Sequence, residues 1–405
     1  MTIVSDIVER LEGITKWQKK FLLKLFVAIL ATHSRINFLN LSRHSSVHEK
    51  TYRRGFRRQF DFARFNEAVM QSGMAVQSDK AFAQDASFSA KSGKKTFGLD
   101  KFWNGCVSRT EKGLEVSLLA LVDVQRKQAF ALSAEQTPAL PDLQATDKSA
   151  SRMDFYLQHL QRAAGYFPQG VKYGLFDGFY GKQKFVAGVV DLGFEVVSKL
   201  RCDADLKYLF AGEQKKRGRK RQYDGKVQFN ELWRFEQVEK GEEEEEAMTL
   251  YSQVVWSVRL KRKVRVVVVV NHLEEQKRRY VVLFSTDLRL AARQMLAYYR
   301  ARFSMEYIFR DAKQFAGFSD CQARTKEALH FHFNASVATV NLARLLAQKE
   351  AQEKEKMVFS MASIKQRCFN EQLLERFISK LELDRNLIKT HPQFESLRNY
   401  AVIAP

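Results

Sequence analysis

With 405 residues and 45% hydrophobic content, the chain is long enough for two or three domains around a sizeable core. Its 67 lysines and arginines outnumber 46 acidic residues, and the net charge of +21 favours a polyanionic partner, above all a nucleic acid. No apolar stretch is long enough to span a membrane, no signal peptide is evident, and the four cysteines lack metal-site spacing, so we expect a cytoplasmic protein without a zinc site.

The N-terminal part of the chain is expected to be helical. Residues 17–32 carry apolar side chains at helical spacing, and residues 46–49 (S-V-H-E) have the pattern of a capping box that begins another helix. In that second helix Tyr52, Phe56 and Phe60 recur every fourth residue and predict a buried side. Its basic side resembles the reading element of a helix-turn-helix, with a solvated basic helix as the alternative. The cations expected on DNA are Lys50, Arg53, Arg54, Arg57 and Arg58.

Strand patterns begin at about residue 81. The predicted elements are strands at 81–89, 114–124, 128–132, 171–177 and 194–200, with a helix at 151–164. This order predicts an α/β fold with a mixed sheet. Asp85 lies at the centre of the first strand and Asp177 at the end of the fourth, so both carboxylates are expected near one rim of the sheet. Aspartates also form turns and cap helices, and the competing candidates are Asp123, Asp191, Asp203 and Asp205.

The middle of the chain is expected to be a β-rich segment with two opposed charge runs. Its strand-like stretches are residues 251–259, 263–271 and 279–285. The basic run at 215–221 (K-K-R-G-R-K-R) predicts a phosphate clamp or a DNA-contacting loop, whereas the five glutamates at 242–246 are typical of a solvated loop.

Four residues with the spacing Y-x2-R-x3-E-x6-K carry the most specific pattern. Residues 288–315 contain no Pro or Gly and predict one helix, which ends just before Gly317. At about 100° per residue, steps of three, four and seven keep the four side chains within roughly 60° of one another. One helix face then carries a phenol, two cations and a carboxylate: Tyr299, Arg302, Glu306 and Lys313. A solvated charged face is the alternative.

Carboxylates that converge from Asp85, Asp177 and Glu306 would suit a hard divalent cation. Oxygen ligands with open positions for water and phosphate are typical of Mg²⁺ or Mn²⁺ sites. A pair of such ions activates a water or a hydroxyl and stabilises the leaving oxygen in phosphoryl transfer. The residue types therefore predict metal-dependent chemistry on a phosphodiester.

The Y-R-E-K spacing matches, without a gap, the signature of bacterial insertion-sequence DDE transposases of the "insertion sequence four" type. The sequence that follows Asp85 (A-S-F-S-A-K-S-G-K-K-T-F-G-L) resembles the first-aspartate region of that group, and Asp177-Gly-Phe-Tyr resembles its second. The basic stretch at residues 51–61 is similar to its end-binding domains. The resemblance runs from about residue 15 to 345.

This resemblance implies an RNase H-like core in which Asp85, Asp177 and Glu306 hold two Mg²⁺ ions, with Mn²⁺ as a substitute. It also implies that Tyr299, Arg302 and Lys313 hold the phosphate of the cleaved strand. In the family an aromatic residue of the β-rich insertion stacks on a flipped base; Trp256 and Trp233 are the candidates, although core packing is the simpler expectation for both.

The implied organisation has five parts: a helical DNA-end-binding domain (1–78), the first part of the core (79–204), the β-rich insertion (205–286), the second part of the core (287–346) and a helical tail (347–405). The implied function is cut-and-paste transposition by a cytoplasmic, nucleoid-associated bacterial homodimer that pairs two transposon ends and a target duplex. A catalytically silent DNA-binding regulator with the same fold is the main alternative, and a junction resolvase-like nuclease is a third.

Overall fold

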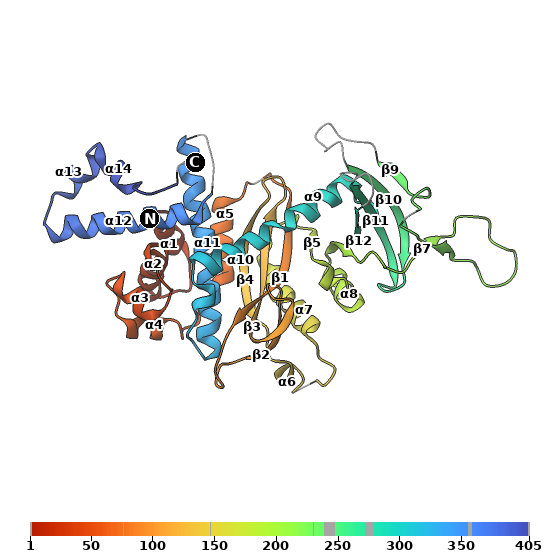
Figure 1. Cartoon of the computed structure of the whole chain (residues 1–405), viewed down its shortest axis with the longest axis horizontal. Coiled ribbons are helices and arrows are strands. Elements are labelled where there is room, and N and C mark those ends of the chain that lie inside the picture. Colours follow the sequence, from red (N-terminus) through yellow and green to blue (C-terminus); the bar gives the residue numbers. More distant parts are fainter. Residues whose placement is uncertain are drawn as a thin grey trace.

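The computed structural model describes residues 2–75, 77–145, 147–229, 231–238, 248–271, 279–354 and 359–403. The glutamate run at 242–246 lies outside the described residues. The protein is an elongated α/β molecule (Figure 1). The N-terminal and C-terminal helices lie together on one side, and a long sheet extends away from them.

The described strands form one mixed sheet with the order β2-β3-β1-β5-β6-β12-β11-β10-β7-β8, to which β4 is added beside β3 and β9 beside β10. The first half of the chain contributes β1 (Lys80–Ala90), β2 (Asp100–Asn104), β3 (Arg109–Asp123), β4 (Gln128–Gln136), β5 (Tyr173–Leu175) and β6 (Glu195–Leu200). The later strands are β7 (Leu206–Leu209), β8 (Tyr223–Lys226), β9 (Glu236–Val238), β10 (Met248–Ser257), β11 (Arg262–Asn271) and β12 (Arg279–Ser285). The predicted mixed sheet is confirmed.

Both pairing directions occur in this sheet. The predicted hairpin is present, because β3 pairs antiparallel with β4 around a turn in which Lys127 has a positive φ of 49°. Strand β1 pairs antiparallel with β3 and parallel with β5, and β5 pairs parallel with β6. The strands of the middle segment then continue the same sheet, since β12 pairs antiparallel with β6.

Helices cover both faces of the first half of the sheet (Figure 1). Alternation along β1 divides its side chains between two hydrophobic clusters: Ala81 and Ala83 belong to one, and Phe82 to the other. The first cluster includes residues of α2 (Lys16–Ala31), α5 (Phe62–Gly73), α10 (Ser304–Phe315) and α11 (Lys326–Lys354), and the second those of α7 (Arg152–Ala163) and α8 (Gln183–Asp191).

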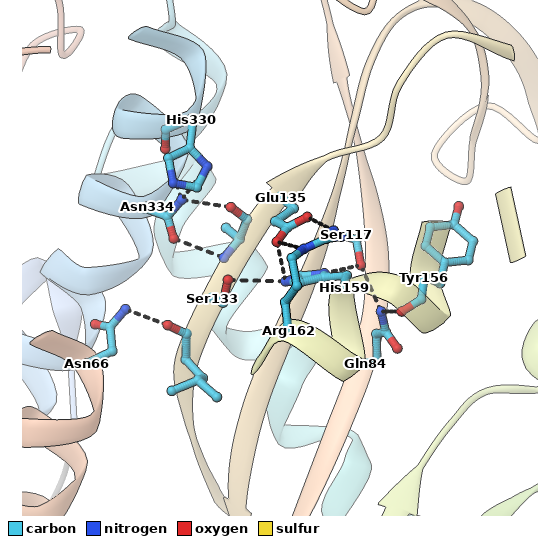
Figure 2. A network of polar contacts seen from close by, with 12 residues as sticks. Asn66, Gln84, Ser117, Ser133, Glu135, Tyr156, His159, Arg162, His330 and Asn334 are labelled. Carbon is cyan, nitrogen blue, oxygen red and sulfur yellow. Dashed lines mark hydrogen bonds and ion pairs between the residues drawn. The ribbon is translucent and has the colours of Figure 1, made fainter. Parts of the chain in front are cut away.

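Buried polar side chains join these helices to the sheet (Figure 2). His159 of α7 is fully buried, with Nδ1 3.0 Å from Ser117 Oγ and Nε2 3.1 Å from Ser133 Oγ. On the other face, the Asn334 amide of α11 donates to the Ala134 carbonyl at 2.7 Å. Because these groups satisfy one another in the interior, the network fixes the helices at defined positions on the strands.

The N-terminal helices share a core with the C-terminal ones. Phe331 of α11 contacts Phe21, Phe56 and Phe62 through their rings. Residues of α1 (Thr2–Arg10), α2 and α12 (Met361–Lys380) belong to the same cluster. The remaining short helices are α3 (Phe38–Arg43), α4 (Glu49–Gly55), α6 (Leu140–Leu143), α13 (Arg385–Thr390) and α14 (Gln393–Arg398). The expected boundary at residue 347 falls inside α11.

Two helix predictions need correction. The basic helix α4 does not begin with a capping box at Ser46; its N-cap is His48, whose Nδ1 accepts from the Lys50 N–H at 3.2 Å. The helix ends at Gly55, so Phe60 lies beyond it. Gly55 packs against Phe21 so closely that a Cβ would lie 2.2 Å from the ring, which requires glycine there.

The predicted helix over 288–315 is two helices, α9 (Ala292–Arg302) and α10, with an interruption at Phe303. Around the break, Glu306 N–H donates to Phe303 O at 3.0 Å, a three-residue step. The Ser304 hydroxyl donates to the Ala301 carbonyl at 2.7 Å and so competes with the backbone for that acceptor. The start also shifts, because Asp287 Oδ1 accepts from Arg289 N–H and holds a turn before α9.

Candidate active site

Asp85 lies within β1, and Asp177 lies just past the end of the neighbouring parallel strand β5. In the β1–β5 ladder Ala83 pairs with Leu175, and each aspartate follows two residues later. Asp85 has the same parity in β1 as Ala83, which places it on the face that carries α9 and α10. The predicted meeting of these two carboxylates is therefore what the strand register produces.

Each aspartate is held by nearby backbone. Asp177 Oδ1 accepts from the Phe179 N–H at 2.9 Å at the start of the 3₁₀ turn η2 (Gly178–Tyr180). Its own carbonyl accepts from Ser198 Oγ at 2.8 Å. Asp85 Oδ1 accepts from the Ala86 N–H at 2.8 Å. Both side chains are therefore fixed in orientation by short hydrogen bonds.

Asp85 and Asp177 are buried close together, and both carboxyl groups have raised pKa values. Burial raises the pKa of Asp85 to about 7, with further contributions from the negative charges of Asp177 and Glu306. Burial also raises the pKa of Asp177, against the opposing effect of the nearby Arg302. The site thus carries more negative charge than its surroundings stabilise.

Arg302 links the third carboxylate to the pair. Its Nη2 donates to Glu306 Oε1 at 2.9 Å, and its Nη1 lies 3.7 Å from Asp85 Oδ2. The side chain is only 12% exposed. Its buried Nε has no hydrogen-bond partner among the residues that the structure describes. Burial acts to lower the pKa of Arg302, but Asp85, Tyr299 and Glu306 outweigh this effect.

The carboxylates of Asp85, Asp177 and Glu306 do not converge closely enough to form a metal site in this conformation. Within the part of the chain that the structure describes, no three His, Cys, Asp or Glu side chains are close enough together to hold one metal ion. The guanidinium of Arg302 is instead the group that contacts both Asp85 and Glu306.

Of the other two signature residues, one joins this cluster and one lies apart. Tyr299 is half-buried one turn before Arg302, whose Cζ is 5.8 Å from its ring centroid. Burial raises the pKa of Tyr299. Lys313 lies two turns after Glu306, where burial lowers its pKa and the neighbouring Cys106 opposes that change. The predicted common face therefore brings Tyr299, Arg302 and Glu306 into contact but leaves Lys313 further along α10.

The cations predicted on the N-terminal helix are all exposed: Lys50, Arg53, Arg54, Arg57 and Arg58. Several lie over aromatic rings, since Arg58 is 4.8 Å from the Trp17 centroid and Arg53 is 5.3 Å from that of Phe38. Arg53 also pairs with Glu49 at 2.5 Å. Lys50, Arg53 and Arg54 lie on α4, whereas Arg57 and Arg58 follow its end at Gly55, so the predicted placement on one helix is wrong for these last two cations.

The tryptophan candidates differ in their surroundings. Trp256 is half-buried on β10 and lies 5.7 Å from the ring of Tyr223. Trp233 is 80% exposed, so the expectation of core packing is wrong for this residue. It lies in a turn between β8 and β9, where no strand pairing buries it. The basic run at 215–221 is an exposed loop closed by Gln214, which donates to the Arg221 carbonyl at 2.8 Å.

Two of the four competing aspartates have local roles. Asp123 Oδ1 accepts from Arg126 N–H in the β3–β4 turn, and Asp203 pairs with Arg201 at 2.9 Å. Sequence reasoning did not assign the cations in the loop after β1, Lys91, Lys94 and Lys95, although three lysines within five residues are a visible signal.

The family model for DDE superfamily endonucleases matches residues 11–262. The chain belongs to this family. In this DDE endonuclease, the matched segment includes Asp85 and Asp177 and ends before Glu306. No curated protein matches the sequence. Among the helices that the structure describes in the endonuclease, none is long and apolar enough to cross a membrane.

Proposed function

We propose that this DDE endonuclease is a transposase of the "insertion sequence four" type. It binds the terminal inverted repeats of an insertion sequence and catalyses metal-dependent strand cleavage and strand transfer. The observation that carries the proposal is the contact between Arg302 and carboxylates from two distant elements, Asp85 of β1 and Glu306 of α10, beside Asp177.

The strand order supports an RNase H-like core. The strands β4, β3, β1, β5 and β6 lie in that order, with the first three antiparallel and the last three parallel. The five-part organisation stated above is kept with this proposal, and residues 205–286 are then an insertion whose strands extend the core sheet through β12.

The donor set fits a divalent cation by its chemistry. Asp85, Asp177 and Glu306 supply oxygen atoms of the kind that Mg²⁺ and Mn²⁺ prefer, and the raised pKa of Asp85 marks a site that a cation would stabilise. These three residues would hold two ions once Arg302 releases Glu306. Such ions, when bound, activate the attacking oxygen and stabilise the leaving one.

Arg302 is suited to hold the phosphodiester. A guanidinium presents paired donors that match two phosphate oxygens, and its charge acts strongly because the side chain is almost fully buried. A phosphate that takes these donors frees both Asp85 and Glu306 from the ion pair. Tyr299 lies next to the same guanidinium and positions it. Lys313, which lies further along α10, contacts the DNA strand.

The remaining assignments follow the same proposal. The exposed cations of α4 and of the turn that follows it bind the transposon ends, and the exposed ring of Trp233 is better placed than that of Trp256 to stack on a flipped base. Two copies of the chain pair the ends in the bacterial cytoplasm.

The direct test is Mg²⁺-dependent nicking of duplexes that carry the inverted repeats flanking the gene. We expect nicks at the repeat ends, none in EDTA, and no cleavage of duplexes with scrambled repeats. End binding without nicking, in Mg²⁺ and in Mn²⁺, would contradict the proposal and identify a silent DNA-binding regulator instead.

A further inference from the structure

A second basic site lies between the N-terminal helices and the sheet. It is a cleft of about 850 Å³ whose walls come from α4, from residues 91–96 after β1 and from residues 321–325 before α11. No Asp or Glu is among its lining residues, all of which the structure describes. The cations that line this basic cleft are Arg53, Arg57, Lys91, Lys94, Lys95 and Arg324.

The walls of the basic cleft are tied together by hydrogen bonds. The Phe97 N–H donates to the Arg324 carbonyl at 2.9 Å, which joins the loop after β1 to the segment before α11. Lys91 Nζ donates to the carbonyl of Cys321 in the same segment. One backbone N–H and the ammonium group of Lys91 therefore hold the loop after β1 against the segment before α11.

Most of its cations have no counter-charge. The side chains of Arg57, Lys94, Lys95 and Arg324 are exposed, and none makes a hydrogen bond or ion pair within the described residues. Their mutual repulsion is thus uncompensated, and the positive charge of Arg324 adds to burial in lowering the pKa of Lys91. A ligand that supplies several negative charges along one line removes this repulsion; the phosphates of a nucleic acid strand have that form.

The basic cleft also has a defined relation to the carboxylates. Asp85 and Ser89 share one face of β1, and Lys91 follows two residues after Ser89. The five residue steps from Asp85 to Ala90 span about 16 Å at about 3.3 Å per residue. Phosphates of one strand rise about 3.4 Å per nucleotide along the duplex axis and lie further apart than that through space, so this distance covers at most about five nucleotides.

We propose that the basic cleft binds the sugar-phosphate backbone of duplex DNA within about five nucleotides of the phosphate that is cut, without reading its sequence. The inference rests on the proposed function, because it places the cleft relative to cleavage by Asp85, Asp177 and Glu306. It joins the α4 surface to the candidate active site along one DNA backbone.

The binding test uses the full chain and a duplex of random sequence. The variant K94Q/K95Q removes two exposed cations of the cleft, and K148Q/K380Q removes two exposed lysines outside it. Loss of two phosphate contacts should weaken binding roughly 60-fold at 0.1 M salt and flatten the slope of log K against log salt by about 1.8. The control should change neither quantity. Thermal melts of all three proteins verify that the substitutions leave the fold intact.

The location test attaches a photocrosslinker to the cysteine of K95C in a C106S/C202S background, because Cys106 and Cys202 are free and exposed, with K148C in the same background as the matched control. We expect K95C to crosslink the DNA strand within about five nucleotides of the nick, and K148C to give no discrete crosslink. Equal salt slopes for K94Q/K95Q and K148Q/K380Q overturn the inference even if the wild-type protein nicks DNA. A wild-type protein that binds but never nicks contradicts the proposed function, while a flattened salt slope would still support a phosphate-binding cleft.

Discussion

The negative charge of Asp177 helps to raise the pKa of Asp85 to about 7, so the protein holds two acids side by side that resist simultaneous ionisation. Burial is the larger cause, and the parallel register of β1 and β5 is what makes the two side chains neighbours. This arrangement gives the candidate site a measurable signature before any reaction takes place.

In EDTA, Asp85 should make the protein less stable as the pH rises. A carboxyl group with a raised pKa in the folded state contributes stability below pH 4 and loses that contribution as the pH passes through about 7. The loss amounts to at most about 4 kcal/mol, since a pKa unit is worth about 1.4 kcal/mol. D85N should therefore melt at a higher temperature than wild type at pH 8 in EDTA.

Addition of Mg²⁺ should raise the Tm of wild type and leave that of D85N nearly unchanged. A wild-type Tm that changes neither with pH nor on addition of Mg²⁺ would contradict a metal site at Asp85.

Replacement of any one carboxylate by its amide should abolish cleavage with DNA-end binding largely kept. The variants D85N, D177N and E306Q retain shape but remove a charge from the oxygen donors. We expect single-turnover nicking to fall by at least about a hundredfold, comparable to the loss of a catalytic electrostatic group. The matched controls are D191N and D203N, which change exposed aspartates elsewhere. Normal cleavage by D177N would mean that another acid acts in its place.

Arg302 should matter more for cleavage than for binding. Its guanidinium is nearly buried between Asp85 and Glu306, where a positioned cation stabilises developing charge better than it would in water. R302A should reduce single-turnover cleavage about a hundredfold and end binding much less, and R302K should restore only part of the rate because lysine lacks the planar fork. R300A, which removes an exposed arginine of the same helix, is the control. Equal losses in both assays would assign Arg302 to binding alone.

His159 should make the protein acid-sensitive. It is fully buried between Ser117 and Ser133, and burial lowers its pKa to about 4 (Figure 2). A histidine whose folded-state pKa is depressed contributes stability above pH 6.5 and loses it as the pH falls towards 4, by up to about 3 kcal/mol. Urea unfolding of wild type between pH 7 and 4 should show this loss, and H159Q should show a shallower dependence from a lower starting stability. H391Q, at an exposed histidine, should follow wild type.

Strand positions could be predicted from the sequence because alternation of polarity reports directly on the two faces of a sheet. Asp85 and Asp177 were placed together for that reason, because the parallel register of β1 and β5 brings the two positions side by side. The break at Phe303 could not be predicted, because it depends on which acceptor the Ser304 hydroxyl selects once Ala301 is packed. The exposure of Trp233 likewise depends on the turn that contains it, since its composition alone favours burial.

The contacts of Arg302 lay beyond sequence reasoning for a related cause. Helical spacing put Arg302 near Glu306 correctly, but its approach to Asp85 depends on how α9 packs on the sheet, a contact between residues more than two hundred positions apart. Lys313 shows the opposite case. The spacing predicted a shared face for Lys313, but two turns of rise separate it from Glu306.

The pairing of β12 with β6 also sets a length. Neighbouring strands lie about 4.8 Å apart, and five such steps, through β5, β6, β12 and β11, lead from β1 to β10. Measured across the strands alone, Asp85 and Trp256 are thus about 24 Å apart. Along the axis of a duplex, at about 3.4 Å of rise per nucleotide, this span corresponds to about seven nucleotides. The sheet thereby acts as a spacer of fixed size, and it defines the shortest flank that a substrate can carry and still reach both ends.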